Sequence, residues 1–197
     1  LKRIIRGVAQ KHSLKASFMA KPFLDTAGNG MHLHMSVVNK TGDNIFDSKT
    51  LSGTQVLKNA VGGLLNSLNE STLIFAPHLN SYRRLKPGSH APTSICWGYE
   101  NRTASIRIPG GASENSRIEH RVAGADANPY LVAAAVLASV LNGIEKEIIA
   151  PDPIEGDSYA KGLDQITSDW RTAIDIFKSG TLNKDFYSNT FLEVFSN

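Results

Sequence analysis

The sequence has 197 residues, of which 41% are hydrophobic and 20% are charged, and it carries a formal net charge of +3. A chain of this length can bury a core without cross-links, and this composition excludes a disordered tail, a collagen-like repeat and a disulfide-rich miniprotein. Cys96 is the single cysteine, which excludes an internal disulfide and a thiolate zinc site. The apolar runs are too short to cross a bilayer, so we expect no membrane partner.

Positive charge is concentrated in the first three quarters of the chain. Residues 151–197 hold 4 basic and 8 acidic side chains, whereas residues 1–150 hold 17 basic and 10 acidic ones. Such a basic segment attracts anions such as phosphates, carboxylates or nucleic acid. Lysine-rich runs and known nucleic-acid-binding motifs are lacking, so we expect small anionic ligands and no nucleic acid.

The first half of the chain predicts two helices and two strands. LKRIIRGVAQKH has its apolar side chains on one helical face and no preceding N-cap, so we expect a helix that belongs to a longer chain. Strands are expected over 16–23 and 31–38, with a glycine turn between them. Apolar residues recur at helical spacing over 51–68. The stretch 76–93 is rich in Pro, Gly, Ser and Asn and predicts an extended loop.

Three further strands are predicted, at 94–99, 104–109 and 116–124. We expect the first two to form a hairpin. Asn128 followed by Pro129 is a strong helix start, and this helix is expected to continue to Ile149. Two more helices are expected over 168–177 and 184–195. Several antiparallel strands followed by helices predict an α+β fold.

The segment MHLHMS predicts a row of polar side chains on one face of a sheet. Successive residues of a strand alternate, so His32, His34 and Ser36 share one face and Met31 and Met35 the other. Two imidazoles at this spacing could ligate zinc or manganese, or donate to phosphate. They could also be ordinary half-exposed histidines, and the spacing alone favours that alternative.

A second row is expected in SRIEHR. Arg117, Glu119 and Arg121 fall on one face of the strand, and Ile118 and His120 fall on the other. If exposed, this row is a salt-bridge ladder that contributes little to stability. If enclosed, its charges need polar partners, which a metal ion and anionic ligands would supply. Spacing alone leaves both alternatives open.

Arginine and glycine provide two further signals. Six of the seven basic residues between Arg83 and Arg121 are arginine, which suits fork-like binding of carboxylate or phosphate. Arg107 lies inside an apolar strand, where a charge is costly unless something binds it. The turn from Gly28 to Gly30 could allow close approach of a ligand, or could simply be a hairpin turn.

Taken together, these motifs resemble the glutamine synthetase family. The matching stretches are FMAKPF, GNGMHLHMS, NSYRRLKPG, NRTASIRIP, RIEHR and NPYLVAAAVLASVLNGIEK, which lie within about residues 16–150. The resemblance implies the C-terminal part of the catalytic domain, an antiparallel curved half-barrel sheet flanked by helices. Residues 1–150 would form the sheet and the active-site core and residues 151–197 the C-terminal helices, and the N-terminal β-grasp domain would be absent.

The family joins the γ-carboxylate of glutamate to an amine: ATP phosphorylates the carboxylate, and the amine then displaces phosphate. The resemblance therefore implies ATP with Mg²⁺ or Mn²⁺, glutamate with an amine or ammonia, a homo-oligomer built from hexameric rings, and a cytoplasmic location. It implies metal ligation by His32 and Glu119, nucleotide binding by His34, Ser36, Arg107 and Arg117, substrate binding by Gly28, Arg84 and Arg121, and stabilisation of the transferring phosphoryl group by Arg102.

The flap that follows the YRRL motif departs from ammonia-using members of the family. Those members carry a glutamate that binds ammonium and takes its proton, whereas PGSHAP places His90 there, and Ala27 replaces the asparagine that usually precedes Gly28. Imidazole can still accept a proton near neutral pH, which makes His90 a catalytic candidate. The motifs look most like the γ-glutamylpolyamine synthetase branch and imply a larger amine such as putrescine.

Two alternatives remain, a true glutamine synthetase and a non-catalytic relative. The resemblance also implies that the 197 residues are inactive by themselves, because the ligands of a first metal ion would lie upstream and a neighbouring subunit would complete the site.

Overall fold

A small sheet and two long crossing helices organise the chain in the computed structural model, which describes residues 1–50, 52–111 and 113–197. The helices are α1 (Lys2–Lys11), α2 (Gln55–Asn66), α3 (Thr72–Phe75), α4 (Pro129–Glu145), α5 (Trp170–Ser179), α6 (Thr181–Phe186) and α7 (Asn189–Phe195). The strands are β1 (Leu33–Met35), β2 (Trp97–Tyr99), β3 (Ile106–Ile108) and β4 (Ile118–His120). Short 3-10 helices span Leu79–Arg83, Ser113–Asn115 and Ser158–Ala160.

The strands form a mixed sheet in the order β1-β4-β3-β2. β4 is antiparallel to both β1 and β3, whereas β2 runs parallel to β3. The α+β class is confirmed, but the prediction of a wholly antiparallel sheet, with a hairpin of 94–99 and 104–109, is wrong. The loop between these strands carries the chain back to the start of β2, and Asn101 fixes its turn by accepting from the backbone N–H of Thr103 over 2.9 Å.

Two other predicted elements differ from the structure. Residues 16–23 form no strand, because the backbone of Lys21 pairs with the side-chain amide of Asn80, over 2.8 and 2.9 Å, instead of with a neighbouring strand. The single helix expected over 184–195 is two helices, α6 and α7. Ser188 interrupts it with extended backbone and caps α7 by accepting from the N–H of Phe191.

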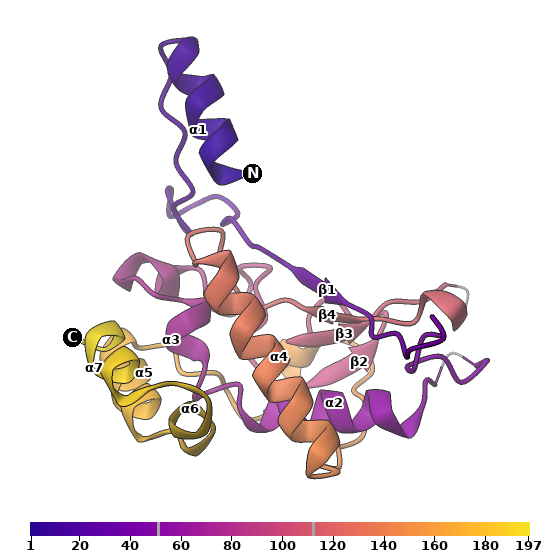
Figure 1. Ribbon diagram of the computed structural model, residues 1–197. Helices are drawn as coiled ribbons and strands as arrows, with labels where there is room; N and C mark the ends of the chain where they lie inside the picture. The colour runs from indigo at the N-terminus through magenta and orange to yellow at the C-terminus, as the bar shows by residue number, and fades with distance from the viewer. Residues whose placement is uncertain (51, 112) are drawn as a thin grey trace.

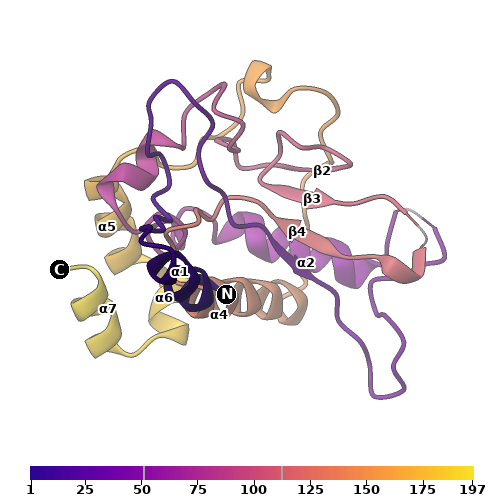
Figure 2. The same cartoon turned by 90° about the horizontal axis from the view of Figure 1, so that it is seen from above.

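The helices α2 and α4 cross closely beneath the sheet (Figures 1 and 2). Thr54 caps the first by accepting from the N–H of Leu57, and Asn128 caps the second by accepting from the N–H of Tyr130. Gly63 permits the crossing, because a Cβ there would overlap the backbone of α4. The helix predicted to begin at Pro129 is therefore confirmed.

The alternation predicted for the strands is also observed. Ile106, Ile118 and His120 point toward the helices and are fully or almost fully buried, and His120 packs against Phe75 with ring centroids 4.3 Å apart. Burial lowers the pKa of His120 to about 3, so its imidazole is neutral at physiological pH. The opposite face of the sheet is free of these core helices and carries the polar rows.

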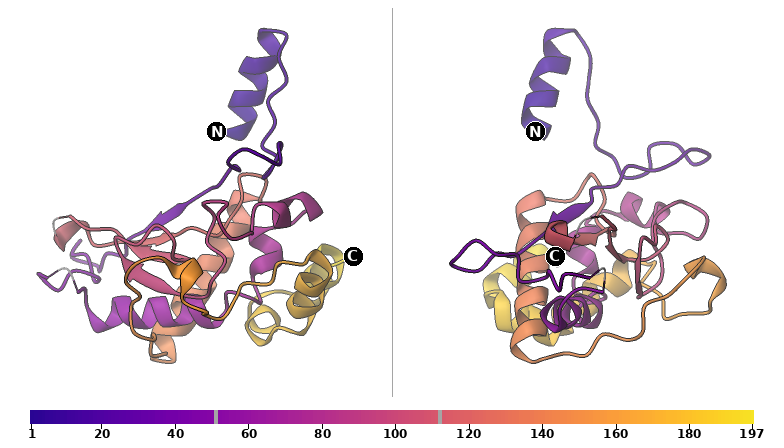
Figure 3. Two further views of the ribbon diagram at one scale, coloured as in Figure 1. Left: turned by 180° about the vertical axis from the view of Figure 1, so that it is seen from behind. Right: turned by 90° about the vertical axis from the view of Figure 1, so that its right-hand side faces the viewer.

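The two ends of the chain lie away from the sheet. α1 projects from the body and none of its side chains is buried, while α5, α6 and α7 gather on the far side of α3 (Figures 1 and 3). Among the described residues, each helix is too short or too polar to span a lipid bilayer.

Candidate active site

A row of polar residues crosses the sheet face that the helices leave open. In the strand register His34 lies opposite Glu119, and Glu119 lies opposite Arg107. Residues paired in this way point to the same face. The next position in the row is Gly98 of β2, where a Cβ would lie 2.5 Å from the carbonyl oxygen of Ile154. Glycine is needed there because the chain at Ile154 runs against the edge strand β2, where the N–H of Ile154 donates to the carbonyl of Trp97 over 2.8 Å.

Glu119 is the centre of this row. Its Oε2 accepts from Arg107 Nη1 over 2.8 Å, and its Oε1 lies 3.1 Å from Arg121 Nη1 and 2.9 Å from His32 Nδ1. The Glu119 side chain is only 4% exposed. Of the two alternatives for the charged row, an exposed salt-bridge ladder or an enclosed set of charges, the second therefore applies to this carboxylate. Burial by itself would raise the pKa of Glu119, but the hydrogen bond from Arg107 and the charges of Arg121 and Arg107 outweigh burial and lower it. The carboxylate is therefore ionised.

The predicted row of Arg117, Glu119 and Arg121 is only partly a charge ladder. Arg117 is partly exposed, and its Nε donates to His34 Nδ1 over 3.3 Å instead of contacting the carboxylate of Glu119. His34 Nε2 in turn lies 3.7 Å from Glu119 Oε1. The arginine row and the histidine row therefore meet at Glu119, as the resemblance implied for His32 and Glu119.

His32 has the properties of a neutral metal ligand. Burial and the positive charge of Arg121 lower the pKa of His32 below its usual value, although the charge of Glu119 acts in the opposite direction. A neutral imidazole that donates from Nδ1 to Glu119 keeps a lone pair on Nε2. His32 and Glu119 together therefore offer nitrogen and oxygen donors of the kind that manganese and magnesium accept.

The same residues do not make a complete metal site. Within the described part of the chain, no group of three or more His, Cys, Asp or Glu side chains is placed to hold a metal ion. His32 and Glu119 fit a divalent ion only as two members of a larger ligand set. The remaining ligands would have to come from another part of the protein, from substrate or from water.

A cavity of about 340 Å³ opens beside His32. Its lining residues are Ala27, Gly28, Gly30, His32, Arg84, Ser89, His90 and Ala91. Arg84 is 4% exposed and donates from Nη1 to the carbonyl of Val122 over 2.7 Å. A Cβ on Gly30 would lie 2.8 Å from Arg84 Nη2, so glycine lets the backbone approach the guanidinium. Burial lowers the pKa of Arg84 to about 10, which leaves it charged at neutral pH and suited to a carboxylate.

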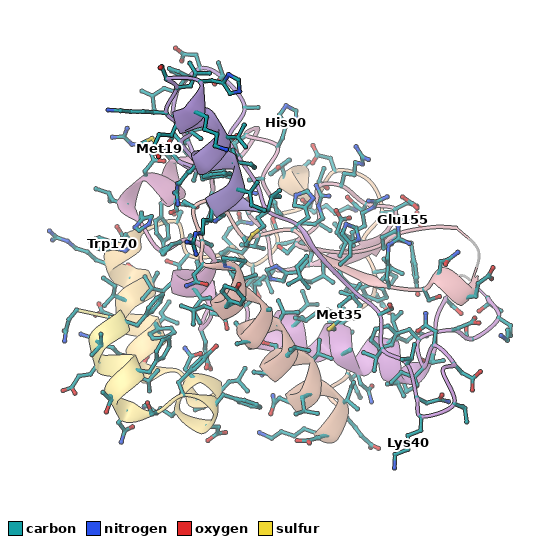
Figure 4. The ribbon with its side chains drawn as sticks, turned by 45° about the horizontal axis from the view of Figure 1, so that its top comes forward. Met19, Met35, Lys40, His90, Glu155 and Trp170 are labelled. Carbon is teal, nitrogen blue, oxygen red and sulfur yellow. The ribbon has the colours of Figure 1, made fainter. Side chains whose placement is uncertain are left out.

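The flap, residues 85–91, forms one wall of this cavity. His90 has a left-handed backbone with φ of 62°, and Gly88 has φ of 75°. Ser89 Oγ donates to the carbonyl of Arg84, which ties the flap to its own first turn. Figure 4 shows the His90 side chain at the outer edge of the molecule, far from the core-side Met35. An imidazole in this position can reach a ligand that enters the cavity from solvent.

Arg102 and Arg107 extend the basic surface beyond Glu119. Arg121 Nη2 donates to the carbonyl of Arg102 over 2.8 Å, and the Arg102 side chain is exposed. Arg107 is held between Glu119 and Glu100, and Glu100 also accepts from the N–H of Gly110. Among the described residues, the buried Nε groups of Arg107 and Arg121 have no hydrogen-bond partner.

The structure thus gathers the predicted site residues into one region. Gly28, His32, Arg84 and His90 share the cavity, and the carboxylate of Glu119 joins it to the basic row. Ser36 lies on the same face as His34 and is exposed, but makes no polar contact within the described part of the chain. The sequence did not predict the ion pair between Glu100 and Arg107. The only sign of it is an acidic residue two positions before Arg102.

Comparisons with known proteins identify similar chains. The family described as glutamine synthetase, catalytic domain, matches residues 1–197. The γ-glutamylputrescine synthetase PuuA of Escherichia coli (strain K12) is 44% identical over 165 residues, covering 84% of this chain and 34% of that protein. The γ-glutamylethanolamide synthetase GlnA4 of Streptomyces coelicolor is 33% identical over 192 residues, covering 98% and 41%.

A solved structure described as GmaS without ligand has a TM-score of 0.88 at 32% sequence identity, and the match covers 99% of this chain and 46% of that one. The chain therefore spans between about a third and a half of the length of these relatives.

Proposed function

Because the chain belongs to the glutamine synthetase family, we propose that it supplies part of the active site of an ATP-dependent carboxylate–amine ligase. The γ-phosphoryl group of ATP is transferred to the γ-carboxylate of glutamate, the amine nitrogen attacks the acyl carbon, and phosphate leaves. One observation carries this proposal: the buried carboxylate of Glu119 is shared by His32, Arg107 and Arg121 beside a cavity floored by Arg84.

His32 and Glu119 would hold a divalent ion, Mg²⁺ or Mn²⁺, together with ligands from elsewhere in the complete protein. When bound, the ion supplies neutralisation of the negative charge on the phosphates. The ionised carboxylate and the neutral imidazole support this role. The proposal matches the expectation that the 197 residues provide only some of the metal ligands.

The basic row would bind and orient the nucleotide. Phosphoryl transfer mainly demands positioning and charge stabilisation. Arg107 and Arg117 would contact the phosphates, His34 and Ser36 would lie along the nucleotide, and the exposed Arg102 would reach the phosphoryl group in transit. The exposed side chain of Arg102 supports an anion at this end of the row.

The cavity would take the amino-acid substrate. Arg84 and Arg121 are buried cations that can bind its carboxylate. Gly28 lines the cavity where a Cβ would lie 2.7 Å from the carbonyl oxygen of Ala20 and 3.1 Å from the side chain of Arg84, so only glycine fits there. His90, on the flap, would accept a proton from the attacking amine.

We propose a primary amine larger than ammonia as the second substrate. Two relatives are named after their products, γ-glutamylputrescine and γ-glutamylethanolamide. In addition, the flap carries an imidazole where an ammonium site requires a carboxylate. The alternative is a true glutamine synthetase, which is the name that other relatives carry. The same proposal includes three further features. The complete protein would form a homo-oligomer of hexameric rings and would be cytoplasmic. Further strands would extend the sheet at the open edge of β1 into a curved half-barrel.

Product analysis in the complete protein tests the function. Glutamate, ATP and Mg²⁺ are incubated with ammonium, ethanolamine or putrescine, phosphate release is measured, and the γ-glutamyl product is identified by mass spectrometry. We expect phosphate release that depends on the amine and is faster with ethanolamine or putrescine than with ammonium. Preference for ammonium over both amines would establish the glutamine synthetase alternative, and no phosphate release with any of the three would establish the non-catalytic one.

A further inference from the structure

We propose that Tyr159 is a positioning residue that holds the flap in place, so that His90 stays at the wall of the cavity. This inference rests on the proposed function, and it assigns a role in the active site to the segment that follows α4. Tyr159 lies in the 3-10 helix Ser158–Ala160, and its hydroxyl donates to the carbonyl of Ala91 over 2.6 Å. Ala91 directly follows His90 and lines the cavity.

The flap conformation needs such support. A left-handed backbone is unfavourable for residues other than glycine, and His90 adopts it. Conformations of this kind persist where the surrounding structure determines them. On the first side of His90, Ser89 Oγ donates to the Arg84 carbonyl. On the other side, the hydroxyl of Tyr159 binds the very next residue, so the two bonds bracket His90.

Tyr159 is itself held firmly. The side chain of Asp157 accepts from the backbone N–H of Tyr159 over 3.0 Å. The neighbouring Ser158 is 1% exposed and makes two bonds to Thr103, from its N–H to Oγ1 over 3.0 Å and from its Oγ to the carbonyl over 2.8 Å. A rigid donor fixes its acceptor better than a mobile one, so this anchoring suits a positioning role.

The same segment also braces the loop that carries Arg102. Asn101 Nδ2 donates to the carbonyl of Gly156 over 2.8 Å, and Thr103 receives the bonds from Ser158. Residues 156–159 therefore connect the flap with the Arg102 loop. In the proposed reaction, this brace would keep the amine-binding wall and the phosphoryl-stabilising arginine in a constant relative position.

The test is Tyr159→Phe in the complete protein, which removes one hydroxyl and keeps the ring. We expect the KM for the amine, measured with ethanolamine and putrescine, to rise roughly five- to tenfold, as loss of a single hydrogen bond implies. The KM for ATP should change less than twofold. Hydrogen exchange of backbone amides in residues 85–93 should accelerate, whereas exchange in α2 should not.

Tyr130→Phe is the matched control, because Tyr130 is 84% exposed on α4 and does not line the cavity beside His32. It should change neither KM nor exchange. Unchanged amine KM together with unchanged flap exchange in Tyr159→Phe would overturn the proposal. Equal increases in both KM values with a lower Tm would also overturn it, by showing a general structural role.

The inference and the proposed function can fail separately. If the unmodified complete protein releases no phosphate with any amine, the proposed function fails, and flap exchange in Tyr159→Phe still decides whether the hydroxyl holds the flap. Ser89→Ala gives an independent variant: it removes the bond on the other side of His90 and should accelerate exchange in the same residues. Absence of acceleration in Tyr159→Phe would refute the brace, whatever Ser89→Ala shows.

Discussion

The Oε1 atom of Glu119 lies 2.9 Å from Nδ1 of His32, where strand β4 meets the residue that precedes β1. This contact joins the basic row of the sheet to the cavity. It requires both the register of the two strands and the shared face of their polar residues. The candidate site is therefore formed by the sheet, and the chemistry proposed for it depends on an ionised Glu119.

Glu119→Gln tests that dependence. The substitution keeps the shape but leaves the buried guanidiniums of Arg107 and Arg121 without their shared negative charge. We expect a loss of about 3 kcal/mol in the free energy of unfolding, as for other buried ion pairs that lose one partner. Denaturant unfolding of the complete protein measures it. Binding of Mn²⁺, followed by paramagnetic resonance, should weaken at least tenfold.

Glu114→Gln is the control for this substitution, because Glu114 is exposed and its charge faces solvent. It should change the free energy of unfolding by less than about 0.5 kcal/mol. If Glu119→Gln were as mild as this control, Glu119 would not be the charge that holds the two arginines.

His90→Glu tests the basis of amine selection. A carboxylate on the flap would attract ammonium, so we expect the ratio of kcat/KM for ammonium to that for ethanolamine to rise at least tenfold. His90→Asn is the matched control, since asparagine tolerates the left-handed backbone of residue 90 but cannot act as a base near neutral pH. It should lower turnover with every amine alike. An unchanged ratio in His90→Glu would show that selection lies elsewhere.

The sequence predicts this site better than it predicts the sheet. Strand alternation places His32 and Glu119 correctly, because side-chain direction follows from local geometry. The parallel pairing of β2 and β3 is not predictable in this way, since it depends on a loop fixed by the side chain of Asn101. The contact of Tyr159 with Ala91 is equally hidden, because it joins residues far apart in the sequence.

Gly63→Ala tests the helix crossing that supports the sheet. A Cβ on Gly63 would overlap the carbonyl of Ser139 and the backbone of Gly143, neither of which can move without separating α2 from α4. We expect a loss of about 2–3 kcal/mol in the free energy of unfolding. Gly7→Ala in α1 is the control, because a Cβ there meets nothing within 4 Å. It should be neutral or stabilising by up to about 1 kcal/mol.

Ionisation of Tyr187 is expected to lower the free energy of unfolding at alkaline pH. Burial raises the pKa of Tyr187 to about 12, and its hydroxyl has no hydrogen-bond partner among the described residues. A raised pKa means that the folded state binds the proton more tightly than the unfolded state. The contribution of this proton to the free energy of unfolding is fully present below pH 10, the usual pKa of tyrosine, and is lost as pH rises toward 12.

Tyr187→Phe removes the titrating group. We expect the free energy of unfolding at pH 7 to be unchanged or slightly higher, because a buried hydroxyl without a partner is replaced by hydrogen. Above pH 10, the variant should lose stability less steeply than the unmodified protein, and unfolding in urea at pH 7, 10 and 11 compares the two. Parallel curves for the two proteins would show that ionisation of Tyr187 is not coupled to folding, and a large loss at pH 7 would show that its hydroxyl has a partner after all.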